Sequence, residues 1–248
     1  LSNIIETNLQ IFVLSITFVH SQDYFQQKVD YDITVKLDDN NHTLSAFEKI
    51  IYTNNSPDEL SFLWFHIWPN AYKNDSTAYA KQAGPNSKFA NSDSLSRGVI
   101  DSLDFSVNGK KVEWSYHPDW VDVVKLNLIE PLNPGESITI ETPFFVKLPK
   151  VFSRLGHSGK HYEITQWYPK PAVYDRKGWH PMPYLNQGEF FSEFGTFDVK
   201  ITLPKDYRVM ATGDIIDGEK EYSWLEGLTS ITDSLNRLPK KELNQWIK

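Results

Sequence analysis

The stretch Tyr31-Asp32-Ile33-Thr34-Val35-Lys36-Leu37 decides the fold, because its apolar and polar residues alternate with a period of two. That period is typical of a strand with one buried face and one solvated face. The turn-forming run Asp38-Asp39-Asn40-Asn41 follows, and Leu44–Tyr52 (LSAFEKIIY) then returns as a second apolar-rich segment. The pattern predicts a β-hairpin at the start of the folded part of the chain.

More short strands are predicted between turn signals along the chain. We expect them at residues 60–68, 99–107, 111–116, 121–129, 137–147, 194–203 and 207–213. Residues 60–68 are apolar enough to be buried on both faces, and Asn108-Gly109 suits a two-residue hairpin turn. Residues 70–98 form a long polar excursion with a short helix expected at Thr77–Gln82. Short strands without alternating helices predict an all-β fold, an antiparallel β-sandwich over residues 23–218.

The two ends of the chain differ from this middle. Leu9–Val19 (LQIFVLSITFV) is an apolar run of 11 residues, too short to span a bilayer, and polar residues follow it. It predicts a signal peptide over residues 1–21 and an exported, periplasmic or extracellular location. No Lys or Arg precedes the run and residue 1 is Leu, so a buried edge strand or helix is the alternative.

From Glu219 the apolar residues recur at helical intervals of three and four, at Leu225, Leu228, Ile231, Leu235 and Leu238. Residues 219–248 are therefore predicted to be helical. They form a linker or the start of a missing region, or else a terminal helix that packs back on the sandwich.

Composition restricts the partners. The net charge is −7 and no basic patch stands out, which argues against nucleic acid. There is no cysteine, so disulfides and cysteine-ligated metals are excluded. No segment is long and apolar enough for a stable membrane span.

No catalytic motif is found. His157 and His161 have the spacing of a helical zinc pair, but the Glu that should follow the first His is absent and Gly159 lies between them. His66 lies in an apolar strand and is expected to be a satisfied core histidine. Glu189 and Glu193 are a carboxylate pair that spacing alone cannot place across a sugar bond. We therefore predict no catalytic and no metal-ligating residue in this chain.

The run Ile164–Asp175 (ITQWYPKPAVYD) begins like a strand and then breaks. Pro169 and Pro171 each remove a backbone donor, so a central strand cannot continue through them. A rigid aromatic loop at a strand end is a common place for recognition residues.

Three segments, in this order, resemble the N-terminal domain of the zinc aminopeptidase family that includes aminopeptidase N and leukotriene hydrolase, in a bacterial exported branch. They are Tyr31–Tyr72, Ile164–Tyr184 (ITQWYPKPAVYDRKGWHPMPY) and Glu193–Asp214 (EFGTFDVKITLPKDYRVMATGD). The resemblance covers residues 23–225.

The resemblance implies a saddle-like β-sandwich that packs on a thermolysin-like catalytic domain. It also implies that Gln166 lines the pocket for the N-terminal residue of a peptide substrate, since an amide can accept from an ammonium and donate elsewhere. The chain lacks the H-E-x-x-H motif, the downstream Glu ligand and the G-x-M-E-N loop. We therefore expect no cofactor in this chain, which resembles a fragment and should be inactive alone, and zinc in the missing catalytic domain, which would be its partner.

Two other functions stay open at this stage. Exposed rings of Trp120, Trp167 and Trp179 on one sheet face would suit a carbohydrate-binding module. A scaffold that kept the sandwich and lost the enzyme is the other alternative. A surface that faces a catalytic domain would also leave an exposed apolar patch, which we expect near Gln166–Tyr184.

Overall fold

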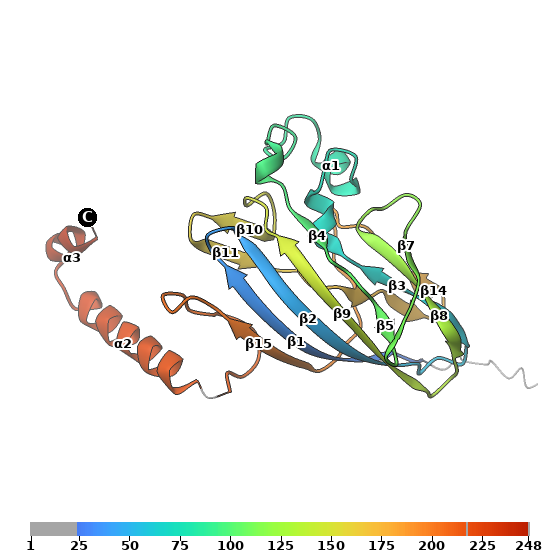
Figure 1. The fold of residues 1–248 in the computed structure, drawn as a ribbon. Helices are drawn as coiled ribbons and strands as arrows, with labels where there is room; N and C mark the ends of the chain where they lie inside the picture. Colours follow the sequence, from blue (N-terminus) through green and yellow to red (C-terminus); the bar gives the residue numbers. More distant parts are fainter. Residues whose placement is uncertain (1–23, 217, 248) are drawn as a thin grey trace, which may run out of the picture. The chain divides into compact units, whose positions relative to one another are not determined.

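The computed structural model describes residues 24–216 and 218–247 (Figure 1). The predicted signal peptide over residues 1–21 lies outside them. The chain divides into two compact units, with the boundary between Thr202 and Leu203. The first unit contains every strand that the structure describes, and the second contains two helices.

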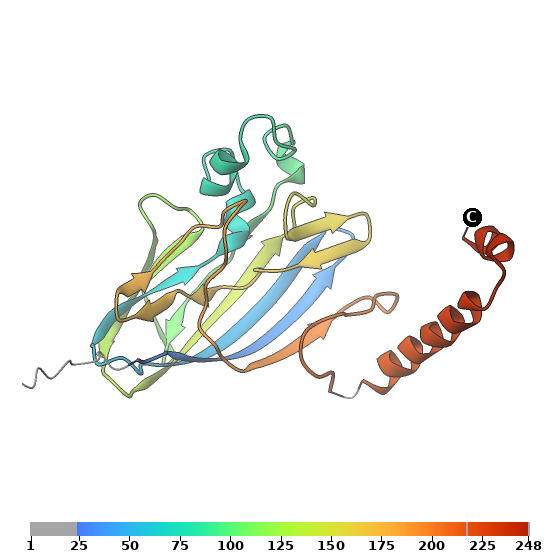
Figure 2. The same cartoon turned by 180° about the vertical axis from the view of Figure 1, so that it is seen from behind.

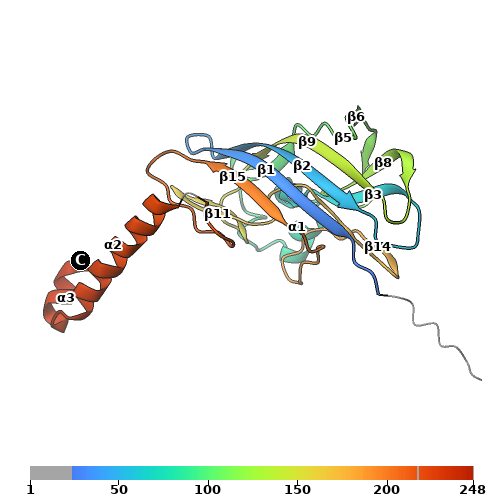
Figure 3. The ribbon, with the colours of Figure 1, turned by 90° about the horizontal axis from the view of Figure 1, so that it is seen from below.

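The larger sheet of the first unit has seven strands in the order β15-β1-β2-β9-β5-β6, with β4 also paired to β9 (Figure 3). They are β1 (Lys28–Asp38), β2 (Thr43–Thr53), β4 (Val99–Asp101), β5 (Ser106–Val107), β6 (Lys110–Lys111), β9 (Ser137–Lys147) and β15 (Phe197–Thr202). The β1–β2 hairpin pairs Tyr31 with Ile50, as the alternating pattern predicts. β15 pairs with β1 in parallel, whereas the other pairs of this sheet are antiparallel.

A four-stranded antiparallel sheet has the order β12-β3-β8-β7. Its strands are β3 (Leu60–His66), β7 (Trp114–Tyr116), β8 (Val123–Leu132) and β12 (Lys170–Pro171). Two separate hairpins join β10 (Leu155–Ser158) to β11 (His161–Ile164) and β13 (Val173–Asp175) to β14 (Gly178–His180). β12 is an edge strand, which is where a proline such as Pro171 can sit without a lost ladder bond.

The core lies between the two sheets, and this confirms the all-β sandwich with a C-terminal helical segment. Phe65 of β3 and Phe105, just before β5, meet edge to face with 5.3 Å between ring centres. The segment after β11 crosses the inner face of the large sheet, where Trp167 packs on Phe144 and Tyr168 on Tyr31 (Figure 2). The second face of β3 is only partly covered, because Phe62 and Trp64 are half-buried, so the prediction of two buried faces was wrong there.

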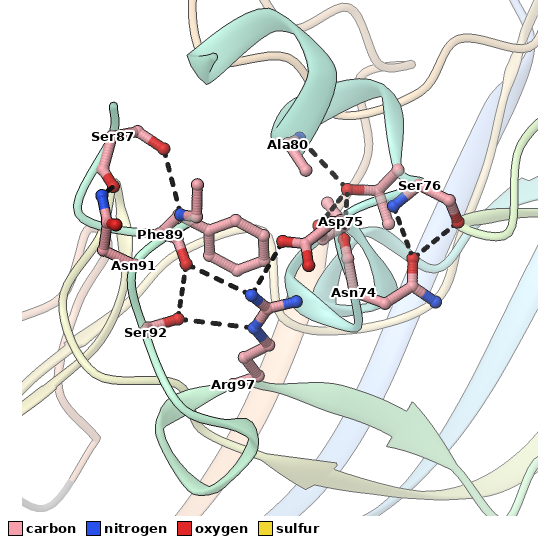
Figure 4. A network of polar contacts seen from close by, with 12 residues as sticks. Asn74, Asp75, Ser76, Ala80, Ser87, Phe89, Asn91, Ser92 and Arg97 are labelled. Atoms are coloured by element: carbon pink, nitrogen blue, oxygen red, sulfur yellow. Dashed lines mark hydrogen bonds and ion pairs between the residues drawn. The ribbon is translucent and has the colours of Figure 1, made fainter. Parts of the chain in front are cut away.

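The long excursion after β3 is an ordered insertion. It holds the 3₁₀ turns η1 (Trp68–Tyr72) and η2 (Ser94–Ser96) and the helix α1 (Ala78–Ala83), which begins at the predicted place because Thr77 caps it. Arg97, near the end of the insertion, contacts three of its residues (Figure 4). Its guanidinium lies 4.5 Å from the ring centre of Phe89 and donates to Asp75 at 2.8 Å, while Nε donates to Ser92 at 3.4 Å.

The hairpin predicted over residues 99–116 is much shorter than expected. Asn108 and Gly109 do have positive φ angles, 49° and 76°, and the turn between β5 and β6 is confirmed. Beyond it the chain changes sheets, because Trp114–Tyr116 pairs with β8 rather than with residues 99–107. Ser102, with φ of 61°, separates β4 from β5.

The exposed apolar row lies on β15, not near Gln166–Tyr184. Phe197, Val199 and Ile201 pair with the core residues Tyr31, Ile33 and Val35 and therefore share their face, yet they are 49%, 38% and 41% exposed. Within residues 166–184 no large apolar side chain is fully exposed. The position predicted for the patch was wrong because the aromatics of that segment pack on the two sheets.

The second unit contains α2 (Glu219–Asn236) and α3 (Lys240–Trp246), with Pro239 between them. Their positions agree with the helical spacing of the sequence. The strand predicted at residues 207–213 is wrong, since these residues have no strand partner. No helix within the described ranges has both the length and the hydropathy to cross a bilayer.

Candidate functional site

Gln166 lies at the junction between the β10–β11 hairpin and the edge strand β12. Its φ angle is +55°, in the left-handed region that non-glycine residues rarely occupy and that is found at ligand sites more often than elsewhere. The preceding residue helps to fix this turn, because Thr165 Oγ1 donates to the carbonyl of Arg154 at 2.5 Å. The half-buried Gln166 side chain is therefore placed by the backbone rather than left free.

Lys170 is the second residue of the candidate site and contacts Gln166. It lies on β12 opposite His66 and is only 4% exposed. Its Nζ donates to Gln166 Oε1 and lies 4.1 Å from the ring centre of Trp68, which is close enough for a cation–π interaction. No carboxylate among the described residues forms an ion pair with Lys170.

The environment of Lys170 disfavours its charge. Burial lowers the pKa of the Lys170 ammonium to about 7, because water that would solvate the charge is excluded. A buried lysine without an acidic partner has a charge that only Gln166 and the aromatic rings compensate.

His66 lies beside this lysine and is completely buried. Its ring stacks on Trp68, with 4.4 Å between centres, and Nε2 accepts from the backbone N–H of Met182 at 3.2 Å. Nδ1 has no hydrogen-bond partner within the part of the chain that the structure describes, so the prediction of a satisfied core histidine is only half right. Burial, followed by the charge of Lys170, lowers the pKa of His66 to about 3, and the ring is neutral at pH 7.

Backbone groups of residues 182–184 form hydrogen bonds with Trp68 and with Asp122. Trp68 Nε1 donates to the carbonyl of Met182 at 3.0 Å, and the Tyr184 N–H donates to Asp122 Oδ2 at 2.7 Å. Burial raises the pKa of Asp122 to about 7. These bonds tie the end of the Ile164–Tyr184 segment to η1 and to the residue that precedes β8.

Another buried ionisable group lies on the inner face of β2. Glu48 is 0% exposed, and neither of its carboxylate oxygens has a hydrogen-bond partner among the described residues. Burial raises the pKa of Glu48 well above its usual range. The pKa of the Tyr168 hydroxyl is also raised, mainly by its own burial and further by the charge of Glu48. Glu48 lies between Ala46 and Ile50 among the alternate residues of β2 whose side chains face the core.

Sequence reasoning named Gln166 but missed Lys170 and Glu48. Glu48 had a signal, since it interrupts the apolar positions of the alternating segment 44–52. Lys170 had none, because it stands between two prolines where no period can be read. Its burial comes from the pairing of β12 with β3.

The two histidines with zinc-like spacing lie on opposite strands of the β10–β11 hairpin, not on a helix. His157 stacks on His42 with 3.6 Å between ring centres, and His161 Nε2 pairs with Glu163 at 2.9 Å. Among residues 24–216 and 218–247, no three His, Asp or Glu side chains come together as metal ligands. The described residues thus do not fit a zinc ion.

Glu189 and Glu193 have different environments, and the three tryptophans that could have formed a sugar-binding surface have different partners. Glu193 is buried and accepts from the Tyr174 N–H at 3.3 Å, while Glu189 is exposed. Trp120 stacks on His117, Trp167 packs on Phe144 and Trp179 packs against Tyr174. All three tryptophans are half-buried on different partners, so they do not form the coplanar exposed row that a sugar platform needs.

No protein-family model matches the sequence, and no curated protein matches it. Solved structures that are similar include an M1 zinc metallopeptidase mutant from Deinococcus radiodurans bound to a Tyr-Ser-Ala substrate. It has 15% identity and a TM-score of 0.44, with 79% of this chain and 36% of that one covered. A two-domain M1 zinc metallopeptidase mutant bound to L-arginine has 16% identity and a TM-score of 0.42, with 78% and 35% covered. The chain spans about a third of the length of these structures.

Proposed function

We propose that this chain is the non-catalytic, substrate-side domain of an exported zinc aminopeptidase-like metallopeptidase. In this proposal the domain shapes the entrance for the N-terminal residue of a peptide, and Gln166 contacts that residue. The observation that carries the proposal is the Gln166 turn. A half-buried amide stands on a left-handed backbone, at the start of a loop that hydrogen bonds fix to the sandwich. Residues in strained backbone conformations cluster at active sites and ligand clamps, so this turn supports a role in ligand binding.

The chemistry of bond cleavage belongs, in this proposal, to a catalytic domain of the parent protein. A zinc site there would supply a water activated for attack on the first peptide bond. This chain's residues would bind and orient the peptide end and exclude water from one side of it.

Photo-cross-linking tests the role of the loop. The chain would be irradiated with a dipeptide whose first residue carries a benzophenone, and the labelled residues identified by mass spectrometry. We expect labels within residues 164–184, competed by unlabelled dipeptide and lost in Gln166→Ala. Labels spread over the surface, or equal labelling of the variant, would refute the proposal. Phe47→Ala, which removes an exposed side chain from β2, is the matched control and should change nothing.

A further inference from the structure

The hydrogen-bonding capacity of Gln166 is already partly used. Its side-chain acceptor, Oε1, already accepts from the Lys170 ammonium, and a substrate ammonium on the second lone pair of Oε1 would lie beside that like charge. The two N–H donors of Nε2 are therefore what the half-buried amide can best offer to a ligand. A substrate ammonium has donors only and would meet donors at this place. The exposed side of the site therefore suits an acceptor.

The positive charge of Lys170 also favours a ligand group that accepts hydrogen bonds. Below pH 7 Lys170 is mostly protonated, and in the described parts of the chain its charge has no carboxylate partner. It lies behind Gln166 in an aromatic wall. The wall is made by Trp68 and Tyr168, whose ring centres lie 4.1 Å and 5.5 Å from Nζ. In such a low-dielectric surrounding an unpaired charge acts more strongly on a ligand than it would in water.

We propose that Gln166 and Lys170 together select peptides whose first residue has an acidic side chain. This rests on the proposed function, and it names the substrate class of that site. Gln166 Nε2 donates to the side-chain carboxylate, and the Lys170 ammonium, one hydrogen bond behind, supplies the compensating charge. Lys170 is then a specificity-determining residue, and the ligand carboxylate is the anion that the buried lysine lacks.

The test compares Asp-Ala amide with Asn-Ala amide, which have the same shape and differ in one charge. Binding to the full chain would be followed by ¹H–¹⁵N NMR at about pH 6, where Lys170 is protonated and an aspartate side chain is ionised. We expect the wild type to bind Asp-Ala amide at least about fivefold more tightly, with shifts at the Gln166 side-chain amide. Lys170→Gln should abolish the difference, while Lys49→Gln, on the outer face of β2, should keep it.

Equal affinity of the wild type for both dipeptides would overturn this inference and leave the proposed function standing. Binding of neither dipeptide would overturn both. The wild-type comparison decides the matter even if Lys170→Gln fails to fold. A fold-preserving Lys170→Gln that keeps the preference would assign the selectivity elsewhere and refute the role of Lys170.

Discussion

Lys170 donates to the side-chain carbonyl of Gln166 from a position on β12 that is almost closed to solvent. The bond joins a left-handed turn to an edge strand, and it places a desolvated ammonium behind a half-buried amide. Both residues belong to the stretch that the family resemblance singles out, but only the fold brings Lys170 against Trp68 and His66.

Lys170→Met should stabilise the fold most at pH 6 and least at pH 10. The ammonium has a pKa near its usual value of 10.5 in the unfolded chain and about 7 in the folded chain, so the unfolded state binds the proton more tightly. The burial penalty is complete below pH 7 and disappears as pH rises through 10.5. We expect a gain of about 2 kcal/mol at pH 6, measured by urea unfolding. A gain independent of pH would contradict the assigned burial of the charge.

Gln166→Gly should lower the free energy of unfolding by only about 1 kcal/mol, because glycine removes the acceptor of the buried Lys170 ammonium but adopts a φ of +55° without strain. Gln166→Val should lower it by about 2 kcal/mol, since a β-branched residue is poorly tolerated there. Thermal unfolding of the two variants checks the order. If valine is tolerated as well as glycine, the turn is not left-handed in solution.

Glu48→Met should stabilise the chain at neutral pH by about 1–3 kcal/mol, because it removes a buried carboxyl without partners. Burial raises the pKa of Glu48 above its unfolded value, so the part of its penalty that comes from ionisation is absent below about pH 4 and grows as pH rises. The gain from Glu48→Met should thus be smallest near about pH 4, where only the burial of a neutral carboxyl is relieved, and should grow above it. The exposed Glu130→Met is the control, and a similar pH-dependent gain there would discount the prediction.

Arg97→Met should loosen the insertion at residues 70–98 without unfolding the sandwich. The change removes the bonds to Asp75 and Ser92 (Figure 4), at a cost of about 1–2 kcal/mol. Limited proteolysis should then cut faster within residues 84–95, while β2 and β9 stay protected. Lys88→Met removes an exposed cation from the same segment and should leave the cleavage rate unchanged.

The sequence predicts the parts of the fold that local pattern determines. β9 has the predicted bounds, Ser137–Lys147, and α1 (Ala78–Ala83) lies within one residue of the predicted helix at Thr77–Gln82, because alternation and helix formation are local properties. The failures are long-range. The sheet change at residues 112–114 and the parallel pairing of β15 with β1 depend on which neighbour a strand finds, and no local pattern encodes that choice.

In the candidate site, too, local sequence does not reveal the features that depend on long-range contacts. Gln166 was predicted from a resemblance, and the local sequence does not show its positive φ angle. The Lys170–Trp68 contact joins the strand β12 to the 3₁₀ turn η1, which are about a hundred positions apart, so spacing could not reveal it.

The most direct test of the central claim is to incubate the purified chain with added zinc and Asp-Ala amide, and to follow the dipeptide by mass spectrometry and NMR together. Our account predicts that the Gln166 amide signal shifts while the dipeptide stays intact. Release of free aspartate that a chelator stops would show that this chain cuts peptides itself, and would contradict the claim that it only holds their N-terminal end.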